Sequence, residues 1–300
     1  MALAHRLQAT GESIRLVART PLPDPLELVY RDGDGPSVTW SCPTTSPTAD
    51  SSAAGRFVDR LVVATKAYSV AEALDVWGPR LAPGARVFFL QNGIGFRRPG
   101  DLPEDVHPLD AVNTGFAAFR SGERTVTQTG NEPFRIGDAA GRATPATGTI
   151  DEDLTRLARA GIRATWTPAI REHQWGKIAA NAVINPLTAI FGCRNGVLLE
   201  REETSDLVDS LCTENTRVLE ALGFPAVGEG LLERTRHIIR ATASNVSSML
   251  TDLNRADGRS ELEFINGRLI RTAEEHGVEI PTNRSIHDRA AEAFAASRID

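Results

Sequence analysis

A change in hydrophobic pattern near Pro168 constrains this chain most. Before that point, short apolar segments at residues 14–18, 60–65 and 86–90 alternate with a stretch of helical spacing at residues 70–81. Apolar strands that lack polar alternation and are separated by helices are typical of a parallel sheet covered on both faces. We therefore expect the first part of the chain to be an α/β, doubly wound, Rossmann-like domain.

After Pro168 the pattern is helical almost throughout, and glycines separate the periodic stretches. Helices are expected at residues 171–191, 203–222, 229–253, 261–276 and 285–296. The chain is accordingly divided into an α/β domain, residues 1–168, and an all-helical domain, residues 169–300. Residues 20–55 are rich in Pro, Ser, Thr and Asp and are expected to be mostly loop with short strands.

The start of the sequence is unusual for a doubly wound domain. Such a domain opens with a buried strand, a glycine-rich turn and a helix. Here residues 2–9 have the pattern of that helix's end, and Ile14 already begins the next strand. We expect the first strand and its glycine loop to be missing from the given sequence. A start site placed too late is the favoured explanation, a real truncation the second, and a domain that begins with a helix the third.

Composition excludes several function classes. The 300 residues carry a net charge of −6, which argues against nucleic acid as a main partner. The 3 cysteines lack metal-ligand spacing and are typical of reduced cytosolic thiols, so no metal is expected and the predicted location is cytoplasmic. The most apolar stretch, residues 178–192, is too short to span a bilayer, so no membrane association is expected.

The richest chemical pattern lies within residues 175–188. Lys177, Asn181 and Asn185 recur at a spacing of i, i+4 and i+8, which places one ammonium and two carboxamides along one face of a helix. Their neighbours are apolar, and buried Asn side chains need hydrogen-bond partners. Spacing alone leaves two interpretations open, a polar pocket for a ligand and a structural hydrogen-bond network between helices.

Together with five other segments, this helix resembles the signature of the ketopantoate reductase family, in order and over essentially the whole chain. The other segments are Thr65-Lys66-Ala67, Gln91-Asn92-Gly93-Ile94-Gly95, Asn195-Gly196, and Ser247-Ser248-Met249-Leu250 followed by Glu261-Leu262-Glu263-Phe264-Ile265-Asn266-Gly267. The resemblance implies that Lys177 is catalytic. It also implies that Asn181 and Asn185 contact the substrate.

Four further positions have an ordinary structural interpretation beside the functional one. Asn92 suits a turn, Lys66 a solvated surface, Ser248 a bond to its own helix backbone, and Glu261 a helix cap. The resemblance instead implies that Asn92, Ser248 and Glu261 bind substrate. It also implies that Lys66, Asn92 and Glu261 lie on the cofactor side.

The position of Arg19 in the sequence predicts which nicotinamide cofactor is bound. NAD sites usually place Asp or Glu at the end of the second strand, where it binds the ribose hydroxyls. Here the strand at residues 14–18 is followed by Arg19, and a guanidinium suits a 2′-phosphate. Both this position and the resemblance therefore favour NADPH over NADH.

The resemblance implies NADPH-dependent reduction of 2-dehydropantoate, or ketopantoate, to (R)-pantoate in pantothenate biosynthesis, with Lys177 as the expected proton donor. Two alternatives stay open. One is a related reductase of the same fold that acts on another branched 2-keto acid. The other is a non-catalytic protein that binds the substrate but not the dinucleotide, because its glycine loop is missing. The sequence leaves a homodimer open.

Overall fold

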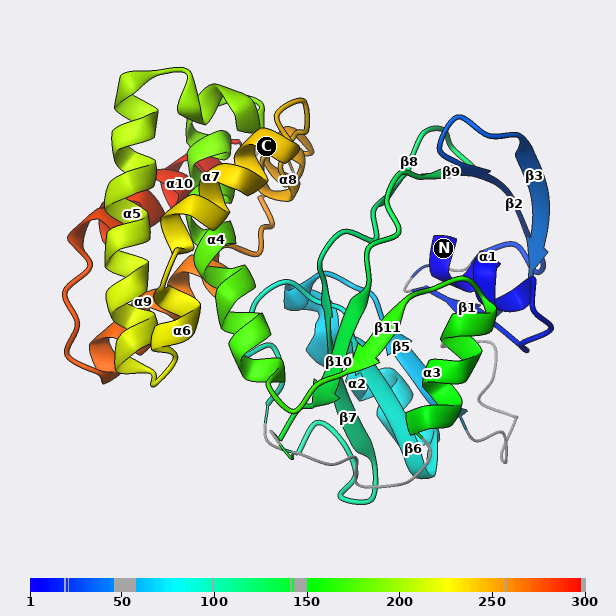
Figure 1. Ribbon diagram of the computed structural model, residues 1–300. Helices are drawn as coiled ribbons and strands as arrows, with labels where there is room; N and C mark the ends of the chain where they lie inside the picture. Colours follow the sequence, from blue (N-terminus) through cyan, green and yellow to red (C-terminus); the bar gives the residue numbers. More distant parts are fainter. Residues whose placement is uncertain are drawn as a thin grey trace. The chain divides into compact units, whose positions relative to one another are not determined.

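The computed structural model describes residues 1–18, 20, 22–45, 58–98, 100–140, 142, 150–256 and 258–297. The chain forms two compact units (Figure 1). The α/β unit comprises Met1–Thr65, Ala71–Leu90 and Pro99–Ile170, and the helical unit comprises Lys66–Val70, Gln91–Arg98 and Arg171–Asp300. Arg19, predicted to select the cofactor, lies outside the described residues.

A five-stranded sheet forms the centre of the α/β unit. Its strands lie in the order β11 (Ala164–Trp166), β10 (Phe134–Asp138), β7 (His107–Asn113), β6 (Leu81–Phe89) and β5 (Val58–Val63). The pairs β5–β6, β6–β7 and β10–β11 are parallel, whereas β7 and β10 are antiparallel. Five consecutive residues at the end of β6 are buried, because the strand is covered on both faces. The predicted Rossmann-like class is confirmed, with one antiparallel pair added.

The strand predicted at residues 14–18 is short. Only β1 (Leu16–Val17) forms there, and it pairs with β4 (Thr44–Thr45) in a separate two-stranded sheet. Within the described residues, β5 is paired with β6 alone. Burial alternates along β5, so that Val63 is 3% exposed and its neighbour Val62 is 39% exposed.

A second sheet was not predicted. It has the order β3 (Ser37–Cys42), β2 (Leu26–Asp32), β9 (Thr125–Gln128) and β8 (Ala118–Arg120). Residues 20–55 were expected to be mostly loop with short strands; β2 and β3 are strands in this region, and their pairing in a regular antiparallel hairpin was not predicted. Alternation holds the hairpin in register, because Leu26, Leu28 and Trp40 turn toward one small core.

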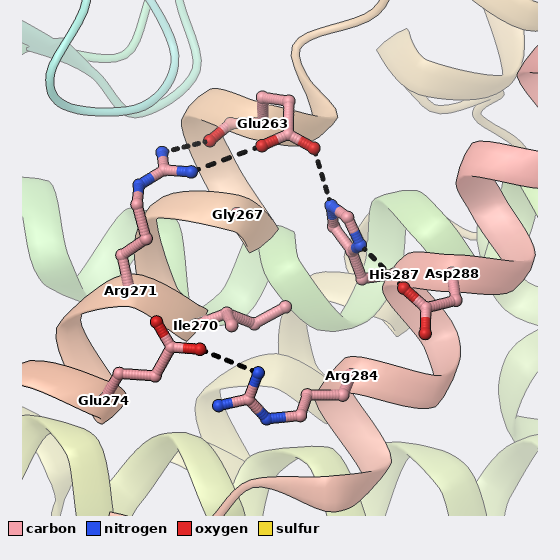
Figure 2. A pocket seen from close by; sticks show the side chains of 8 residues that line it. All are labelled: Glu263, Gly267, Ile270, Arg271, Glu274, Arg284, His287 and Asp288. Carbon is pink, nitrogen blue, oxygen red and sulfur yellow. Dashed lines mark hydrogen bonds and ion pairs between the residues drawn. The ribbon is translucent and has the colours of Figure 1, made fainter. Parts of the chain in front are cut away.

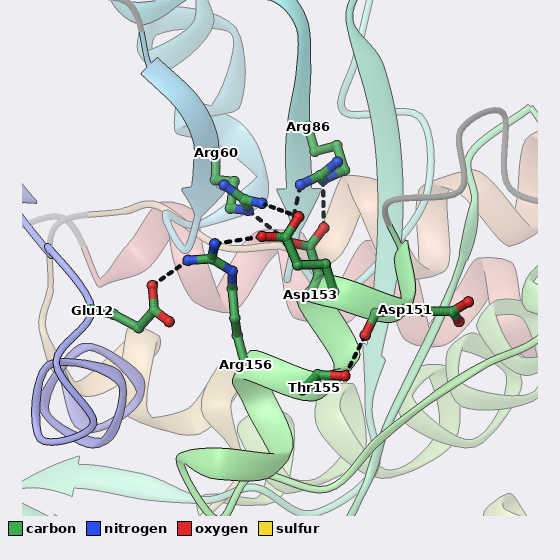
Figure 3. Close-up of polar contacts among 8 residues, drawn as sticks. Glu12, Arg60, Arg86, Asp151, Asp153, Thr155 and Arg156 are labelled. Atoms are coloured by element: carbon green, nitrogen blue, oxygen red, sulfur yellow. Dashed lines mark hydrogen bonds and ion pairs between the residues drawn. The ribbon is translucent and has the colours of Figure 1, made fainter.

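An ion-pair cluster joins one helix of the α/β unit to its sheet and to the segment that follows another helix. The helices of this unit are α1 (Ala2–Gln8), α2 (Val70–Trp77) and α3 (Ile150–Arg159), with a 3₁₀ turn at Gly78–Arg80; the 3₁₀ turn at Ala67–Ser69 belongs to the segment Lys66–Val70 of the helical unit. Asp153 of α3 is 4% exposed and binds Arg60 of β5 at 2.6 Å and Arg86 of β6 (Figure 3). Arg156, one turn later, pairs with Glu12 after α1. Buried charges need such partners, since an unpaired one is strongly destabilising.

The helical unit packs around α4 (Ile170–Phe191). Its other helices are α5 (Glu202–Ala221), α6 (Pro225–Gly228), α7 (Leu231–Ala241), α8 (Ser248–Asn254), α9 (Arg268–Glu275) and α10 (Pro281–Ala296), with a 3₁₀ turn at Asn195–Leu199 and a π-helix at Glu263–Gly267. Ile178, Val183 and Leu187 of α4 lie in the main core of this unit. The predicted burial of this helix is thereby confirmed. Across the described residues, no helix has both the length and the apolar character needed to cross a bilayer.

The single helix expected at residues 229–253 is wrong, because the chain breaks between α7 and α8. The backbone N–H groups of Asn195 and Gly196 donate to the carbonyls of Asn245 and Ala243, at 3.1 and 3.0 Å. Those carbonyls therefore serve the neighbouring segment instead of continuing a helix. Ser247 then caps α8 by accepting a hydrogen bond from the backbone of Leu250.

Candidate functional site

The polar face of α4 is the first part of the site. Lys177 and Asn181 are half-buried and Asn185 is 6% exposed, whereas the apolar residues between them lie in the core. The i, i+4, i+8 spacing therefore puts one ammonium and two carboxamides in a row, as the sequence predicts.

Lys66 forms the second part with two buried carboxylates. Its Nζ lies 2.7 Å from Asp252 Oδ2 and 3.4 Å from Glu261 Oε2. The other oxygen of Glu261 accepts the backbone N–H of Ala67 at 3.1 Å, so this carboxylate is fixed in orientation. Burial works to lower the pKa of Lys66, but the fields of Glu261 and Asp252 outweigh burial and raise the pKa. Lys66 is thus a permanent cation in an ion-pair cluster and not a solvated surface lysine.

Lys177 has the opposite electrostatic environment. Burial lowers its pKa to about 8, and the field of the Glu261 carboxylate acts against this effect. An amine with a pKa near 8 is protonated at neutral pH yet close enough to titration to give up its proton in a reaction. The site therefore combines one lysine held as a cation with one prepared for proton transfer.

The turn containing Asn92 is fixed against the π-helix. Gly93 has φ of 97°, and a Cβ at that position would lie 2.4 Å from the carbonyl oxygen of Phe264. Ile94 donates its backbone N–H to the same oxygen at 3.2 Å. Asn92 does occupy a turn, as its structural interpretation proposes. Only glycine allows this turn to approach the segment that follows Glu261.

Several polar residues of the motif-bearing segments form hydrogen bonds within the helical unit. The Nδ2 of Asn195 donates to Thr242, and the Nδ2 of Asn266 donates to the carbonyl of Ala182. Ser248 is exposed at the first position of α8, while its neighbour Ser247 is the cap. The structure thus brings Lys66 and Glu261 into contact, whereas the Ser248 side chain is exposed on α8.

Sequence reasoning missed Asp252, which is 3% exposed and binds Lys66 more closely than Glu261 does. A compositional signal was available for the lysines. Lys and Arg together number 33, yet Lys66 and Lys177 are the only lysines in the chain. Arginine cannot release a proton near neutral pH, whereas lysine can. In a chain that otherwise uses arginine for its long cationic side chains, both lysines lie in these polar clusters.

The residues fit one end of a nicotinamide cofactor. In the sequence, Lys66 and Asn92 come shortly after the parallel strands β5 and β6. Because Lys66 is held by two carboxylates, its surroundings suit ribose hydroxyls or an amide better than a phosphate. Among the described residues, no group of three or more His, Cys, Asp or Glu side chains could hold a metal.

A surface cavity of about 270 Å³ lies apart from these groups (Figure 2). It is lined by Glu263, Gly267, Ile270, Arg271, Glu274, Arg284, His287 and Asp288. Its charges are paired with one another: Glu263 lies 2.8 Å from His287 and 3.3 Å from Arg271. Because the carboxylate of Glu263 is 60% exposed, these pairs are of the weak surface kind.

Two family models match the sequence. The model described as ketopantoate reductase PanE/ApbA matches residues 1–141, and its C-terminal counterpart matches residues 169–293. The 2-dehydropantoate 2-reductase of Yersinia pestis is 33% identical over 231 residues, which cover 76% of this chain and 72% of that protein. The enzyme of that name from Halobacterium salinarum is 32% identical over 268 residues, covering 88% and 84%.

Solved structures share the fold over nearly the whole chain. A PanE/ApbA family ketopantoate reductase from Ralstonia eutropha superposes with a TM-score of 0.81 at 22% identity, covering 99% of this chain and 95% of that one. D-mandelate dehydrogenase, solved with NADH and anilino(oxo)acetate, gives 0.82 at 17% identity, covering 99% and 96%. A dimeric ketopantoate reductase from Staphylococcus aureus gives 0.78 at 17% identity, covering 99% and 95%.

Proposed function

The chain belongs to the ketopantoate reductase family and is an oxidoreductase of 2-keto acids that uses a nicotinamide cofactor; from this premise we propose that it reduces 2-dehydropantoate to (R)-pantoate with NADPH. The observation that carries the proposal is the row formed by Lys177, Asn181 and Asn185 on one face of α4. Burial lowers the pKa of Lys177 in this row to about 8. Such a row offers a proton donor beside groups that bind a polar acid.

Lys177 is the proposed proton donor. When bound, the reduced nicotinamide cofactor supplies hydride to the carbonyl carbon of the keto acid. The ammonium of Lys177 donates a hydrogen bond to the carbonyl oxygen and gives it a proton as negative charge develops there. The field of Glu261 supports this role, because it opposes the loss of the proton before the reaction.

The remaining site residues are proposed to bind and orient. Asn181 and Asn185 donate their amide N–H groups to the carboxylate and accept the hydroxyl of the substrate. Ser248 and Asn92 add hydrogen bonds from α8 and from the turn after β6. Glu261 accepts from a substrate hydroxyl or from Lys177. These groups thus orient the substrate, and Lys177 alone moves a proton.

Cofactor selection is assigned to Arg19, with Lys66 and Asn92 holding the nicotinamide side. A guanidinium paired with a 2′-phosphate makes a charged hydrogen bond worth about 1.5–3 kcal/mol. The variant Arg19→Ala should therefore bind NADPH roughly ten- to hundred-fold more weakly and leave NADH almost unchanged. Equal losses for both cofactors would remove Arg19 from this role.

A substrate panel tests the reaction itself. Turnover is measured with NADPH and with NADH on 2-dehydropantoate, on shorter branched 2-keto acids and on phenylglyoxylate, the keto acid of mandelate. The proposal expects the highest kcat/KM for 2-dehydropantoate with NADPH. A preference for another acid would favour a related reductase, and binding without turnover a non-catalytic protein. Size-exclusion chromatography of the same samples tests whether this chain is a homodimer.

A further inference from the structure

Asp252 is a buried carboxylate to which the proposed reaction gives no task. It lies near the end of α8 and is 3% exposed. Its Oδ2 lies 2.7 Å from the Nζ of Lys66. Its Oδ1 lies 3.4 Å from the Nη1 of Arg255, whose side chain is 59% exposed. The close pair with Lys66 is therefore the dominant interaction of Asp252.

Lys66 is shared unequally between two carboxylates. Its ammonium lies 0.7 Å closer to Asp252, at 2.7 Å, than to Glu261, at 3.4 Å. Glu261 cannot simply follow the ammonium, because its Oε1 accepts the backbone N–H of Ala67. The Lys66 ammonium is therefore bound more closely by Asp252 than by Glu261.

The formal charges of Lys66 and its two carboxylate partners do not cancel. Asp252, Glu261 and Lys66 together carry a net charge of −1 when all are ionised, and the ammonium of Lys177 brings the four groups to neutrality. Glu261 is the charged group whose field supports the protonated form of Lys177. If Lys66 neutralised Glu261 fully, that support would be lost.

We propose that Asp252 is a positioning residue that holds the Lys66 ammonium closer to its own carboxylate than to Glu261, so that the Glu261 carboxylate keeps its negative charge available to Lys177. This inference rests on the proposed role of Lys177 as proton donor. Without Asp252, the Lys66 ammonium moves onto Glu261, and Lys177 loses its proton at a lower pH.

The experiment measures the pKa of Lys177 without using activity. Lysine side chains are acetylated with trace acetic anhydride over a pH series, and the labelled peptides are quantified by mass spectrometry. Because Lys66 and Lys177 are the only lysines, each reports separately. In Asp252→Asn the pKa of Lys177 should fall by roughly half to one unit. The matched control is Glu263→Gln, which removes an exposed carboxylate of the Figure 2 cavity and should leave Lys177 unchanged.

A double-mutant cycle separates positioning from a direct effect of charge. If Asp252 acts through Lys66, Asp252→Asn should shift Lys177 much less in a Lys66→Met background than in the wild type. Equal shifts in both backgrounds, or no shift in either, would overturn the proposal. Asp252→Ser, which leaves room for water, replaces Asp252→Asn if near-ultraviolet circular dichroism shows that the first variant is unfolded.

The outcome is distinguishable from failure of the proposed function. Labelling reports the ionisation of Lys177 even in a protein that reduces none of the keto acids. If the reaction is as proposed, the alkaline limb of kcat should also move to lower pH in Asp252→Asn, by the same amount as the labelling pKa. A shift in labelling with no turnover on the substrate panel would remove the function and retain the positioning role.

Discussion

The side-chain amide of Asn266 donates a 2.9 Å hydrogen bond to the backbone carbonyl of Ala182. In a regular helix this carbonyl would accept the N–H of the residue four positions later. That residue is Pro186, which has no N–H. Asn266 therefore replaces the missing donor and joins the π-helix to the middle of the helix that carries Lys177.

Removing the side-chain amide of Asn266 should lower the free energy of unfolding. Asn266→Ala leaves a buried carbonyl without a donor, which destabilises a protein by about 1–3 kcal/mol. Urea denaturation followed by circular dichroism measures the loss. In a Pro186→Ala background the helix regains an N–H at position 186, so Asn266→Ala should be less harmful there. Equal losses in both backgrounds would show that Asn266 does not compensate for the proline.

Turnover should depend on Lys177 far more than cofactor binding does. Lys177→Ala is expected to lower kcat by roughly two to four orders of magnitude, the usual contribution of a positioned general acid. Lys177→Arg keeps the positive charge but cannot release a proton near neutral pH, so it should remain strongly impaired. NADPH affinity, measured by calorimetry, should change little in either variant. Near-normal turnover of Lys177→Ala would exclude the residue from the mechanism.

Keto-acid reduction should fail at alkaline pH. Lys177 must be protonated to act as an acid, and burial lowers its pKa to about 8. The kcat/KM for reduction should therefore fall by about tenfold per pH unit well above that value, while oxidation of the hydroxy acid should rise through the same range. A profile for reduction that is flat between pH 7 and 10 would contradict this assignment.

The same lysine should make the folded protein less stable at neutral pH. Its pKa is lowered from 10.5 to about 8 in the folded state, so the unfolded chain binds the proton more tightly. The resulting destabilisation is fully present below pH 8 and disappears as pH rises toward 10.5. Lys177→Met should therefore raise the free energy of unfolding at pH 7, and its advantage should shrink above pH 8. An advantage independent of pH would indicate added apolar packing alone.

Gly93 should be intolerant of any side chain. A Cβ there would lie 2.4 Å from the carbonyl of Phe264, so Gly93→Ala must displace the turn that carries Asn92. Displacement of about 1 Å at a reacting site can lower kcat/KM by roughly a hundredfold. Gly223→Ala is the matched control, since Gly223 has φ of 82° with no atom within 4 Å of its virtual Cβ. The control should lose stability through backbone strain but keep its kcat/KM; equal activity losses would refute the packing argument.

Periodicity predicted those parts of the fold that depend on local pattern. The helix at Ile170–Phe191 and the buried end of β6 follow from the spacing and continuity of apolar residues. The break between α7 and α8 could not be predicted in this way. It depends on the backbone N–H groups of Asn195 and Gly196, which are distant in sequence from the carbonyls they bind. The β2–β3 hairpin was missed because its polar composition was given more weight than its alternation.

The candidate site likewise has a part that local sequence pattern predicted and a part that it did not. The row of Lys177, Asn181 and Asn185 is local, so helical spacing was enough to find it. Asp252 was missed because its partner Lys66 lies 186 positions away, and no local pattern distinguishes a buried aspartate near a helix end from a solvated one. Long-range ion pairs become visible only when the fold brings their residues together.

The scarcity of lysine has a practical consequence for handling the protein. Amine-reactive dyes, crosslinkers and activated resins that attack lysine side chains can do so only at Lys66 and Lys177, which lie in the polar clusters described above. Immobilisation through lysine would therefore fix the molecule by the groups proposed to work in it. The same selectivity makes bound ligands detectable as protection of these two amines from acetylation, with no lysine elsewhere in the chain to contribute background.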